Sequence, residues 1–517
     1  MNRTSESPAP PATPLGGATR TDDGRRAPAG VLGDLLGPRA VGLLVIAVVS
    51  LLSALAVDAA VSSDTAFQLI WGSHVAAGEA PDFRAFGATP HPLAIAAWAA
   101  ASLLGREAAF DIVLASAHVS LGALAWAAFR LGQVTLGAAA GIVAASAVLV
   151  FPAYGGAALR TYLDAPFLAL VLFAAVLEAR RPRRGAPVLV LLALAGLLRP
   201  EAWLLGGLYW LWMLPVMRHS ARAAVTLTTL TAAAPLLWAL GDVVGAGDPL
   251  WSLTSTQEGA VALGRVTGAE NVPRTLTQHL MGTIGPVVLA GGAAGGLIAL
   301  VRRDRRALVV LALAVAGVVS YAAIGVAGLS QIPRYVLLPG LALALLFGYA
   351  ATRVPAELAG RHRGVAVVAG ALVLVGALVL APVRPGGQRS QFRALEGRAN
   401  AVAGIRALAG NPRAAGLLRR CEPVAAVNGR PMAFVAYFVD RRPDTIGSLE
   451  RGRSEPGPRR AIDNGDRGVV LMPRDPGTLD WFVRDSSDAQ RVDPRAPAGM
   501  REAARNSTWR LLRGSCA

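Results

Sequence analysis

Long apolar stretches separated by short polar segments fill the chain between residues 39 and 383. A helix needs about 20 residues to cross the hydrocarbon core of a bilayer, and fewer where the bilayer thins or protein surrounds the helix. The pattern therefore predicts eleven membrane-spanning helices, at residues 40–61, 108–129, 134–151, 165–178, 187–198, 201–217, 223–241, 280–301, 307–327, 336–352 and 364–383.

One apolar segment does not fit this series. Residues 91–104 (HPLAIAAWAAASLL) are too few to cross the membrane, so we expect a helix that lies in the membrane surface. With this segment left out of the count, the arginine clusters between the spans all fall on one side, which the positive-inside rule makes cytoplasmic. The prediction is a multi-pass protein of the cell membrane with its N-terminus in the cytoplasm and its C-terminus outside.

The segment 187–217 begins and ends beside arginines, yet it contains Arg199-Pro200-Glu201 near its centre. Two short helices that meet at a polar vertex explain this pattern, because Pro200 suits the first turn of the second helix. We expect the vertex to lie at or below the outer membrane surface.

Both ends of the chain differ from the apolar middle. Residues 1–38 are rich in Pro, Ser, Thr, Gly and Arg, which predicts a disordered cytoplasmic tail. Residues 385–517 carry charges, turn dipeptides, a helical pattern at 390–410 and short apolar runs such as PVAAVNG, MAFVAYFV and GVVLM. They predict a small extracytoplasmic α/β domain that follows a transmembrane domain at 39–384.

The only two cysteines, Cys421 and Cys516, both lie in this C-terminal region. Their number and position favour one disulfide bond in an oxidising compartment, and two unrelated free thiols are the alternative.

Composition supports the membrane prediction. The 517 residues are 54% hydrophobic and only 16% charged, against about 25% charged in soluble domains. The net charge of +17 comes entirely from arginine, which is scattered at helix ends and forms no single patch, so a nucleic-acid partner is not expected. The sequence contains no phosphate-binding GxxxxGK[ST] loop, HExxH, CxxC or GxSxG motif.

Polar residues with candidate chemistry gather in the predicted outer loops. Asp64 follows the first span, and it is joined by His91, Arg160, Tyr162, Asp164, Arg199, Glu201, Gln331, Arg334 and Tyr335. The three arginines lie on the side that the positive-inside rule leaves poor in arginine, and ionisable groups at such a depth usually have a partner.

The sequence offers partners for two of these arginines. Arg160 is close to Asp164 and Arg199 is close to Glu201, whereas Arg334 has no acidic neighbour and is suited to hold a phosphate with two hydrogen bonds. Snorkelling of the arginines to the interface, and capping of a helix by Asp64, are the alternatives.

The order of these motifs resembles the GT-C superfamily of integral-membrane glycosyltransferases, which includes protein O-mannosyltransferases, aminoarabinose transferases and actinobacterial arabinosyl- and mannosyltransferases. The resemblance is carried by Asp64 after the first span, the TPHPL turn at 89–93 with the short helix behind it, RTYLDAPF around Asp164, LLRPEAWLL at the vertex and QIPRY at 331–335.

The resemblance implies inverting transfer of a sugar from a polyprenyl-phosphate donor to a glycan, lipid or protein acceptor at the outer face of the membrane. Asp64 would act as general base. Arg334, with Arg199 or a protonated His91, would hold the leaving phosphate. Asp164 would position the acceptor or bind a divalent cation, if one is used, and no other cofactor is implied.

Two further functions remain open at this stage. A transporter or flippase for a lipid-linked or anionic substrate would also place arginines and carboxylates in a helix bundle, although such proteins usually show matched halves. A non-catalytic envelope scaffold with the same fold is the second alternative.

Overall fold

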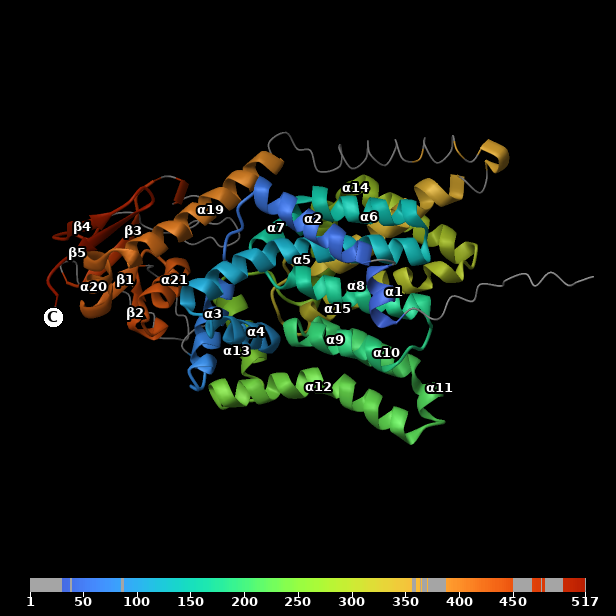
Figure 1. The fold of residues 1–517 in the computed structure, drawn as a ribbon, viewed down its shortest axis with the longest axis horizontal. Coiled ribbons are helices and arrows are strands. Elements are labelled where there is room, and N and C mark those ends of the chain that lie inside the picture. Colours follow the sequence, from blue (N-terminus) through green and yellow to red (C-terminus); the bar gives the residue numbers. More distant parts are fainter. Residues whose placement is uncertain are drawn as a thin grey trace, which may run out of the picture.

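The computed structural model describes residues 30–37, 40–84, 88–355, 359–362, 364, 370, 387–449, 467–475, 477–478 and 496–516. A bundle of roughly parallel helices forms the larger part, and a small sheet domain sits at one end of it (Figure 1). The longer bundle helices are α2 (Val41–Ala56), α5 (Arg106–Thr135), α6 (Ala138–Val150), α8 (Asp164–Arg180), α9 (Ala186–Leu198), α10 (Glu201–Trp212), α12 (Ala221–Ala246), α14 (Val272–Val301), α15 (Leu308–Val326) and α16 (Leu337–Gly348).

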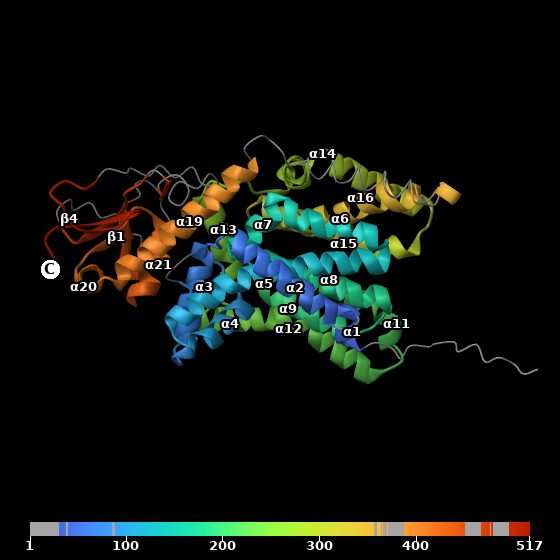
Figure 2. The same cartoon turned by 45° about the horizontal axis from the view of Figure 1, so that its top comes forward.

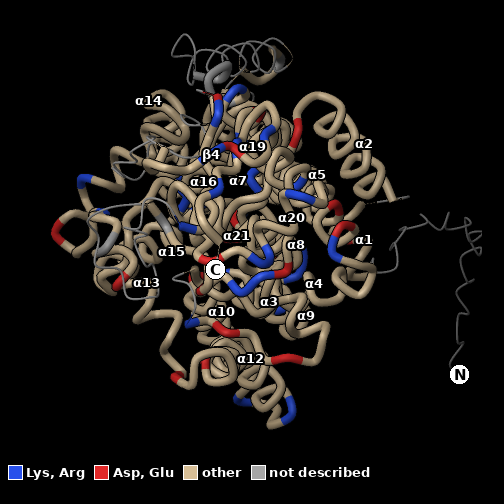
Figure 3. Tube along the Cα trace, turned by 90° about the vertical axis from the view of Figure 1, so that its left-hand side faces the viewer, with Lys and Arg blue, Asp and Glu red and all other residues tan. Residues whose placement is uncertain are grey.

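The bundle has the length and composition of a polytopic membrane protein, which confirms this part of the prediction. Within the described residues, five helices are long and apolar enough to cross a bilayer, or six if α6 and the helix after it, α7 (Pro152–Leu159), count as one span bent by 60°. Helices α2 and α9 are apolar but shorter. Seen from the sheet end, α2 and α14 are nearly free of charged residues (Figure 3). The count of eleven is not confirmed, and the predicted span at 364–383 lies almost wholly outside the described residues.

Several boundaries differ from the prediction. The first span ends at Ala56, because residues 57–62 are extended and Ala60 donates a backbone hydrogen bond to Leu159. The predicted outer loop at 242–279 is mostly helical, since α12 continues to Ala246, α13 (Trp251–Ala262) follows and α14 begins at Val272.

The predicted disordered tail is wrong for its last residues. Residues 31–36 form α1 (Val31–Leu36), and its buried Asp34 forms ion pairs with Arg180 and Arg184 at the end of α8. Two arginines of a predicted cytoplasmic cluster therefore hold this segment to the bundle.

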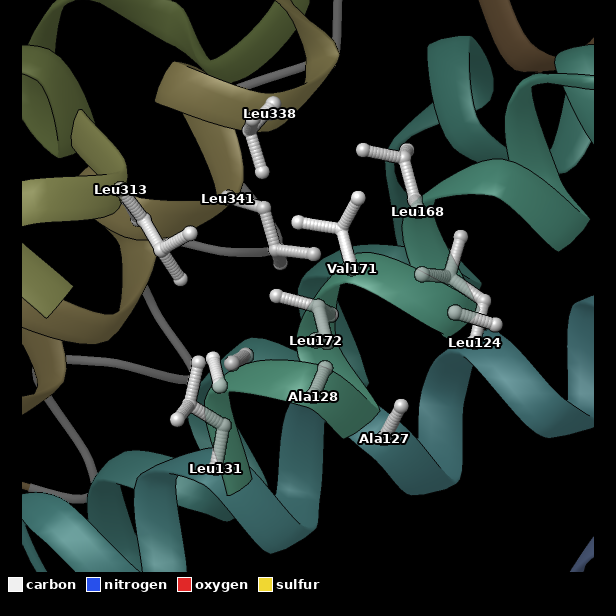
Figure 4. Close-up of a cluster of buried hydrophobic side chains, with 14 of the residues drawn as sticks. Leu124, Ala127, Ala128, Leu131, Leu168, Val171, Leu172, Leu313, Leu338 and Leu341 are labelled. Atoms are coloured by element: carbon white, nitrogen blue, oxygen red, sulfur yellow. The ribbon is translucent and has the colours of Figure 1, made fainter. Parts of the chain in front are cut away.

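Helix α8 lies at the centre of the bundle core. Its buried side chains Leu168, Val171 and Leu172 lie between those of α5 and α16 (Figure 4). Small residues let the neighbouring helices approach closely, as is usual where lipid surrounds a bundle. At the crossing of α5 and α6, a Cβ atom on Gly132 would lie 2.4 Å from Gly141 Cα.

Three short helices or turns take the places that the sequence motifs predict. Residues 92–102 form α4 (Pro92–Ser102), which is too short to span. Helices α9 and α10 meet at Arg199 and Pro200, where the extended conformation of Arg199 suits a residue before proline. A 3₁₀ turn, η4 (Pro333–Val336), leads into α16.

The C-terminal region is an α/β domain, as predicted. In the part of this domain that the structure describes, five strands are ordered β2-β1-β3-β5-β4, with β1 parallel to β2 and β3 and the other pairs antiparallel. The strands are β1 (Val424–Ala426), β2 (Ile446–Ser448), β3 (Val469–Pro473), β4 (Arg501–Arg505) and β5 (Trp509–Arg513). The helices are α19 (Gly387–Gly410), α20 (Pro412–Arg420) and α21 (Gly429–Val439), so the run MAFVAYFV is helical. Cys421 and Cys516 form a disulfide bond with 5.0 Å between their Cα atoms.

The sheet domain is fixed to the end of the bundle where α3 (Ser63–Ala76) and α5 begin. Helix α21 packs against α3. Arg106 donates a hydrogen bond to the Tyr437 carbonyl at 2.7 Å, and Tyr437 returns one to the Arg106 carbonyl at 2.6 Å. Arg406 of α19 forms an ion pair with Asp111 of α5 at 2.7 Å.

We expect Gly132→Ala to destabilise the bundle, because the new methyl group forces α5 and α6 apart. Overpacking of this kind costs about 1–3 kcal/mol. Thermal unfolding of the purified protein in detergent measures the effect. The control is Gly207→Ala in α10, where a Cβ atom meets nothing within 4 Å. Equal melting temperatures for the two variants would contradict the expectation.

Candidate active site

A cavity of about 590 Å³ opens among the ends of α3, α12, α13 and α15, the vertex between α9 and α10, and the turn η4. This volume is in the range of ligand-binding pockets in other proteins. Eight of the ten candidates from the sequence line it, although they come from five separate segments, and they are Asp64, His91, Tyr162, Asp164, Arg199, Glu201, Arg334 and Tyr335.

Two candidates lie elsewhere. Arg160 lines a separate hollow on the side of α2 and α7. Gln331 is buried and joins two loops, since its amide oxygen accepts a hydrogen bond from Thr275 and its amide nitrogen donates one to the Gly268 carbonyl at 2.5 Å. We therefore leave Gln331 out of the site.

Asp64 lies in the first turn of α3, and it does not cap that helix. Ser62 is the N-cap and accepts a hydrogen bond from the Thr65 backbone at 3.2 Å. Neither a hydrogen bond nor an ion pair of the Asp64 side chain occurs within the described residues, and the residue lines the cavity. The first turn of a helix is a favourable place for a carboxylate, so this one is available to a ligand.

Arg199 is at the centre of a buried ion-pair cluster. Its guanidinium donates to Asp164, at the start of α8, and to Glu201 at 2.7 Å and 3.0 Å. The ring centroid of Tyr335 lies 4.8 Å from it. Arg199 thus takes the partner that the sequence suggested for Arg160, and its charge is compensated within the protein. The second Asp164 oxygen is buried without a partner, so it can accept a hydrogen bond from a ligand.

Arg334 has a different environment. Its guanidinium lies over the rings of Tyr162 and Tyr335, 5.2 Å and 5.7 Å from their centroids. No ion pair of Arg334 occurs in the part of the chain that the structure describes, and its Nε atom is buried without a hydrogen-bond partner. A guanidinium held in this way between aromatic rings, with donors free, is suited to a phosphate.

His91 precedes α4 and is neutral, in contrast to the protonated form expected from the sequence. Burial, reinforced by the positive charges of Arg199 and Arg334, lowers the pKa of His91 from 6.5 to about 3. Its Nδ1 atom is buried without a partner, and its ring packs edge-on against Trp238 with 5.5 Å between centroids. His91 can exchange a hydrogen bond with a ligand, but it supplies no charge to a phosphate.

Sequence analysis missed Asp242, which also lines the cavity. It is buried near the end of α12 and accepts hydrogen bonds from the Ser252 backbone at 2.9 Å and the Ser252 hydroxyl at 2.6 Å. Trp238 donates to the same hydroxyl at 2.9 Å. An aspartate at the end of a long apolar stretch destabilises a membrane protein unless other groups form hydrogen bonds with it. The position of Asp242 at the end of such a stretch was therefore the signal by which the sequence could have indicated it.

The described residues include no group of three or more His, Cys, Asp and Glu side chains that could hold a metal ion. Asp164 is already paired with the guanidinium of Arg199, and this cation opposes the binding of a second one. The arrangement therefore does not fit Asp164 as a metal ligand.

Comparison with solved structures identifies the fold. The chain is similar to ArnT from Cupriavidus metallidurans bound to undecaprenyl phosphate, with a TM-score of 0.52, 15% identity and coverage of 91% of this chain and 97% of that one. The apo state of the same protein matches with a TM-score of 0.52 and 16% identity. No protein-family model and no curated sequence matches the chain. The chain therefore has the fold seen in these two structures of ArnT.

The pKa of His91 predicts a loss of stability in acid. The unfolded chain takes up a proton below pH 6.5, whereas the folded protein resists it down to about pH 3. Stability is therefore present above pH 6.5 and falls by up to about 1.4 kcal/mol per pH unit as the pH decreases through this window. The melting temperature of the wild type should fall more between pH 7.5 and pH 5 than that of His91→Gln. The control is His219→Gln, at an exposed histidine, which should behave as the wild type.

Proposed function

We propose that this protein is a membrane glycosyltransferase that moves a sugar from a polyprenyl-phosphate donor to an acceptor, with inversion at the anomeric carbon. The observation that carries the proposal is one cavity, lined both by the carboxylate of Asp64 and by the guanidinium of Arg334, neither of which has an ion pair within the described residues. Sugar transfer from a phosphate requires these two functions, a base for the acceptor and a cation for the leaving group. The fold of ArnT, solved with undecaprenyl phosphate, supports the same donor class.

Asp64 acts as the general base in this proposal. It removes the proton of the acceptor hydroxyl as the oxygen attacks the anomeric carbon from the face opposite the phosphate. The bond between the sugar and the phosphate oxygen breaks with both electrons staying on that oxygen, and Asp64 leaves the step protonated. Asp64 is suited to this role because no protein group competes for its oxygens within the described residues.

Arg334 stabilises the leaving group. The donor phosphodiester carries one negative charge and the released polyprenyl phosphate carries a second, so a cation in place strengthens its contact as the bond breaks. Arg199 cannot take this role fully because Asp164 and Glu201 already compensate its charge. It keeps Asp164 in position, where the free oxygen can accept a hydrogen bond from a sugar or acceptor hydroxyl.

We place the cavity and the sheet domain on the outer side of the membrane. The arginines of residues 180–184 lie with α1 at the end of the bundle far from the sheet domain (Figure 1), and the positive-inside rule puts such clusters in the cytoplasm. The disulfide bond between Cys421 and Cys516 supports an oxidising outer compartment for the sheet domain.

We expect Asp64→Asn to abolish transfer, because the amide cannot accept the proton. Loss of a general base typically lowers the rate by about 10²–10⁴-fold. The assay measures sugar release from undecaprenyl-phosphate-linked mannose or arabinose by the purified protein in detergent, supplied with an envelope lipid and glycan extract as acceptor. A transporter or scaffold would show no transfer in the wild type. The control, Asp82→Asn at an exposed carboxylate outside the cavity, should be fully active.

Arg334→Gln should weaken the binding of undecaprenyl phosphate about 10–100-fold, the loss expected for a charge-assisted contact. Direct binding of the carrier to purified protein in detergent measures this, and Arg274→Gln at an exposed arginine of α14 is the matched control. Unchanged carrier binding in Arg334→Gln would remove Arg334 from the site, while leaving the test of Asp64 intact.

A further inference from the structure

A second hollow lies beside the proposed active site, behind a thin wall of backbone. Residues 58–63 and 159–163 form the wall, and hydrogen bonds join them. Ala60 donates to the Leu159 carbonyl at 2.8 Å, and the Ser62 backbone donates to the Thr161 hydroxyl at 3.2 Å. Residues that are close in sequence within this wall face different cavities. Arg160 faces the second hollow, whereas Tyr162 faces the active-site cavity.

The part of this hollow nearest the bundle is an apolar pocket of about 510 Å³, formed by the end of α2, the bend between α6 and α7, and the start of α19. Large apolar side chains that line it are strongly exposed, with Leu52 at 60%, Leu149 at 49% and Phe392 at 52% of their full accessible surface. Apolar surface that is exposed next to membrane-spanning helices suits lipid chains, so we regard the pocket as open to the bilayer.

A smaller and more polar pocket of about 310 Å³ continues along α19, with Asp58, His118 and Asn400 among its lining residues. One face of α19 covers both pockets, with Phe392 and Leu395 over the apolar one and Ala399 and Asn400 over the polar one. Both views of the fold show α19 lying beside α7 and the end of α2 (Figures 1 and 2). The two pockets lie along the same helix, the apolar one nearer its start, and together we call them the α19 groove.

Arg160 makes this groove favourable for a negatively charged ligand. It is the arginine that lines the apolar pocket, its Nε atom is buried without a hydrogen-bond partner, and no ion pair of Arg160 occurs within the described residues. A guanidinium in apolar surroundings is costly unless an anion accompanies it. A phosphate would take up its free donors with two parallel hydrogen bonds.

We propose that the α19 groove binds a lipid with an anionic phosphate headgroup, its chains along α2 and α7 and its phosphate on Arg160.

Gly155 of α7 allows the groove to be filled without disturbing the helix. It lines the apolar pocket, and a Cβ atom there meets nothing within 4 Å. Gly207 of α10 is the matched control, because it is also helical and partly exposed, and a Cβ atom there also meets nothing. We compare Gly155→Phe with Gly207→Phe, and Arg160→Gln with the wild type, all as full chains in detergent with melting temperatures recorded.

Native mass spectrometry measures the binding of dioleoyl phosphatidic acid and of uncharged dioleoylglycerol. The wild type should bind the phosphatidic acid about tenfold more tightly or better, Arg160→Gln should lose this preference, and Gly155→Phe should lose both lipids, since a charge-assisted contact contributes about tenfold or more. Gly207→Phe should bind as the wild type. Wild-type affinity of Gly155→Phe for phosphatidic acid, or an unchanged preference in Arg160→Gln, overturns the proposal.

The binding of undecaprenyl phosphate distinguishes a failure of the lipid groove from a failure of the proposed function. Gly155→Phe should bind this carrier as tightly as the wild type does, because the carrier phosphate belongs to Arg334 in the other cavity. Loss of both undecaprenyl phosphate and phosphatidic acid in Gly155→Phe would overturn the assignment of a separate lipid groove. If the wild type binds phosphatidic acid in the groove but never transfers sugar, the proposed function fails and the lipid groove stands.

Discussion

The buried ion pairs of Arg199 hold the candidate site together. Asp164 starts α8, the central helix of the bundle, and Glu201 starts α10, so one guanidinium fixes the ends of two helices relative to each other. Removing either partner of a buried pair leaves an uncompensated charge in low dielectric, which costs far more than the intact pair contributes. The positions of Tyr335 and of Asp164, and with them the shape of the cavity, depend on this cluster.

The two arginines of the cavity differ in how their charges are compensated, and this difference follows from the same arrangement. Arg199 is saturated by protein carboxylates, whereas Arg334 rests between aromatic rings and keeps its donors free. A guanidinium that is already ordered loses little entropy when a phosphate arrives. One arginine is therefore held by protein carboxylates and the other keeps donors for a ligand, as the acidic neighbour of Arg199 and the lack of one beside Arg334 already suggested in the sequence.

The sequence predicted the class of fold, the short helix at 91–104, the vertex at Arg199 and eight residues of the cavity, because hydrophobic patterning and membrane side are local properties of a chain. The ion-pair partner of an arginine, by contrast, can come from a distant part of the chain. Arg199 pairs with Asp164 across 35 positions, while Arg160, only four positions from Asp164, faces the other side of the wall. The neutral state of His91 also escaped prediction, because its lowered pKa results first from burial and then from the charges of Arg199 and Arg334, all of which other segments supply. The first span ends earlier than predicted because Ala60 and Ser62 donate their backbone hydrogen bonds to Leu159 and Thr161, which are distant in the sequence.

Helix α3, which carries Asp64, is part of the helix bundle and also packs against the sheet domain. Its buried side chains Phe67, Leu69 and Ile70 share one apolar core with Phe434 and Tyr437 of α21, which come more than 350 positions later in the chain. During synthesis this face of α3 stays uncovered until the last domain has emerged and folded. A chain that lacks its C-terminal domain therefore leaves one apolar face of the helix that carries Asp64 without its packing partner.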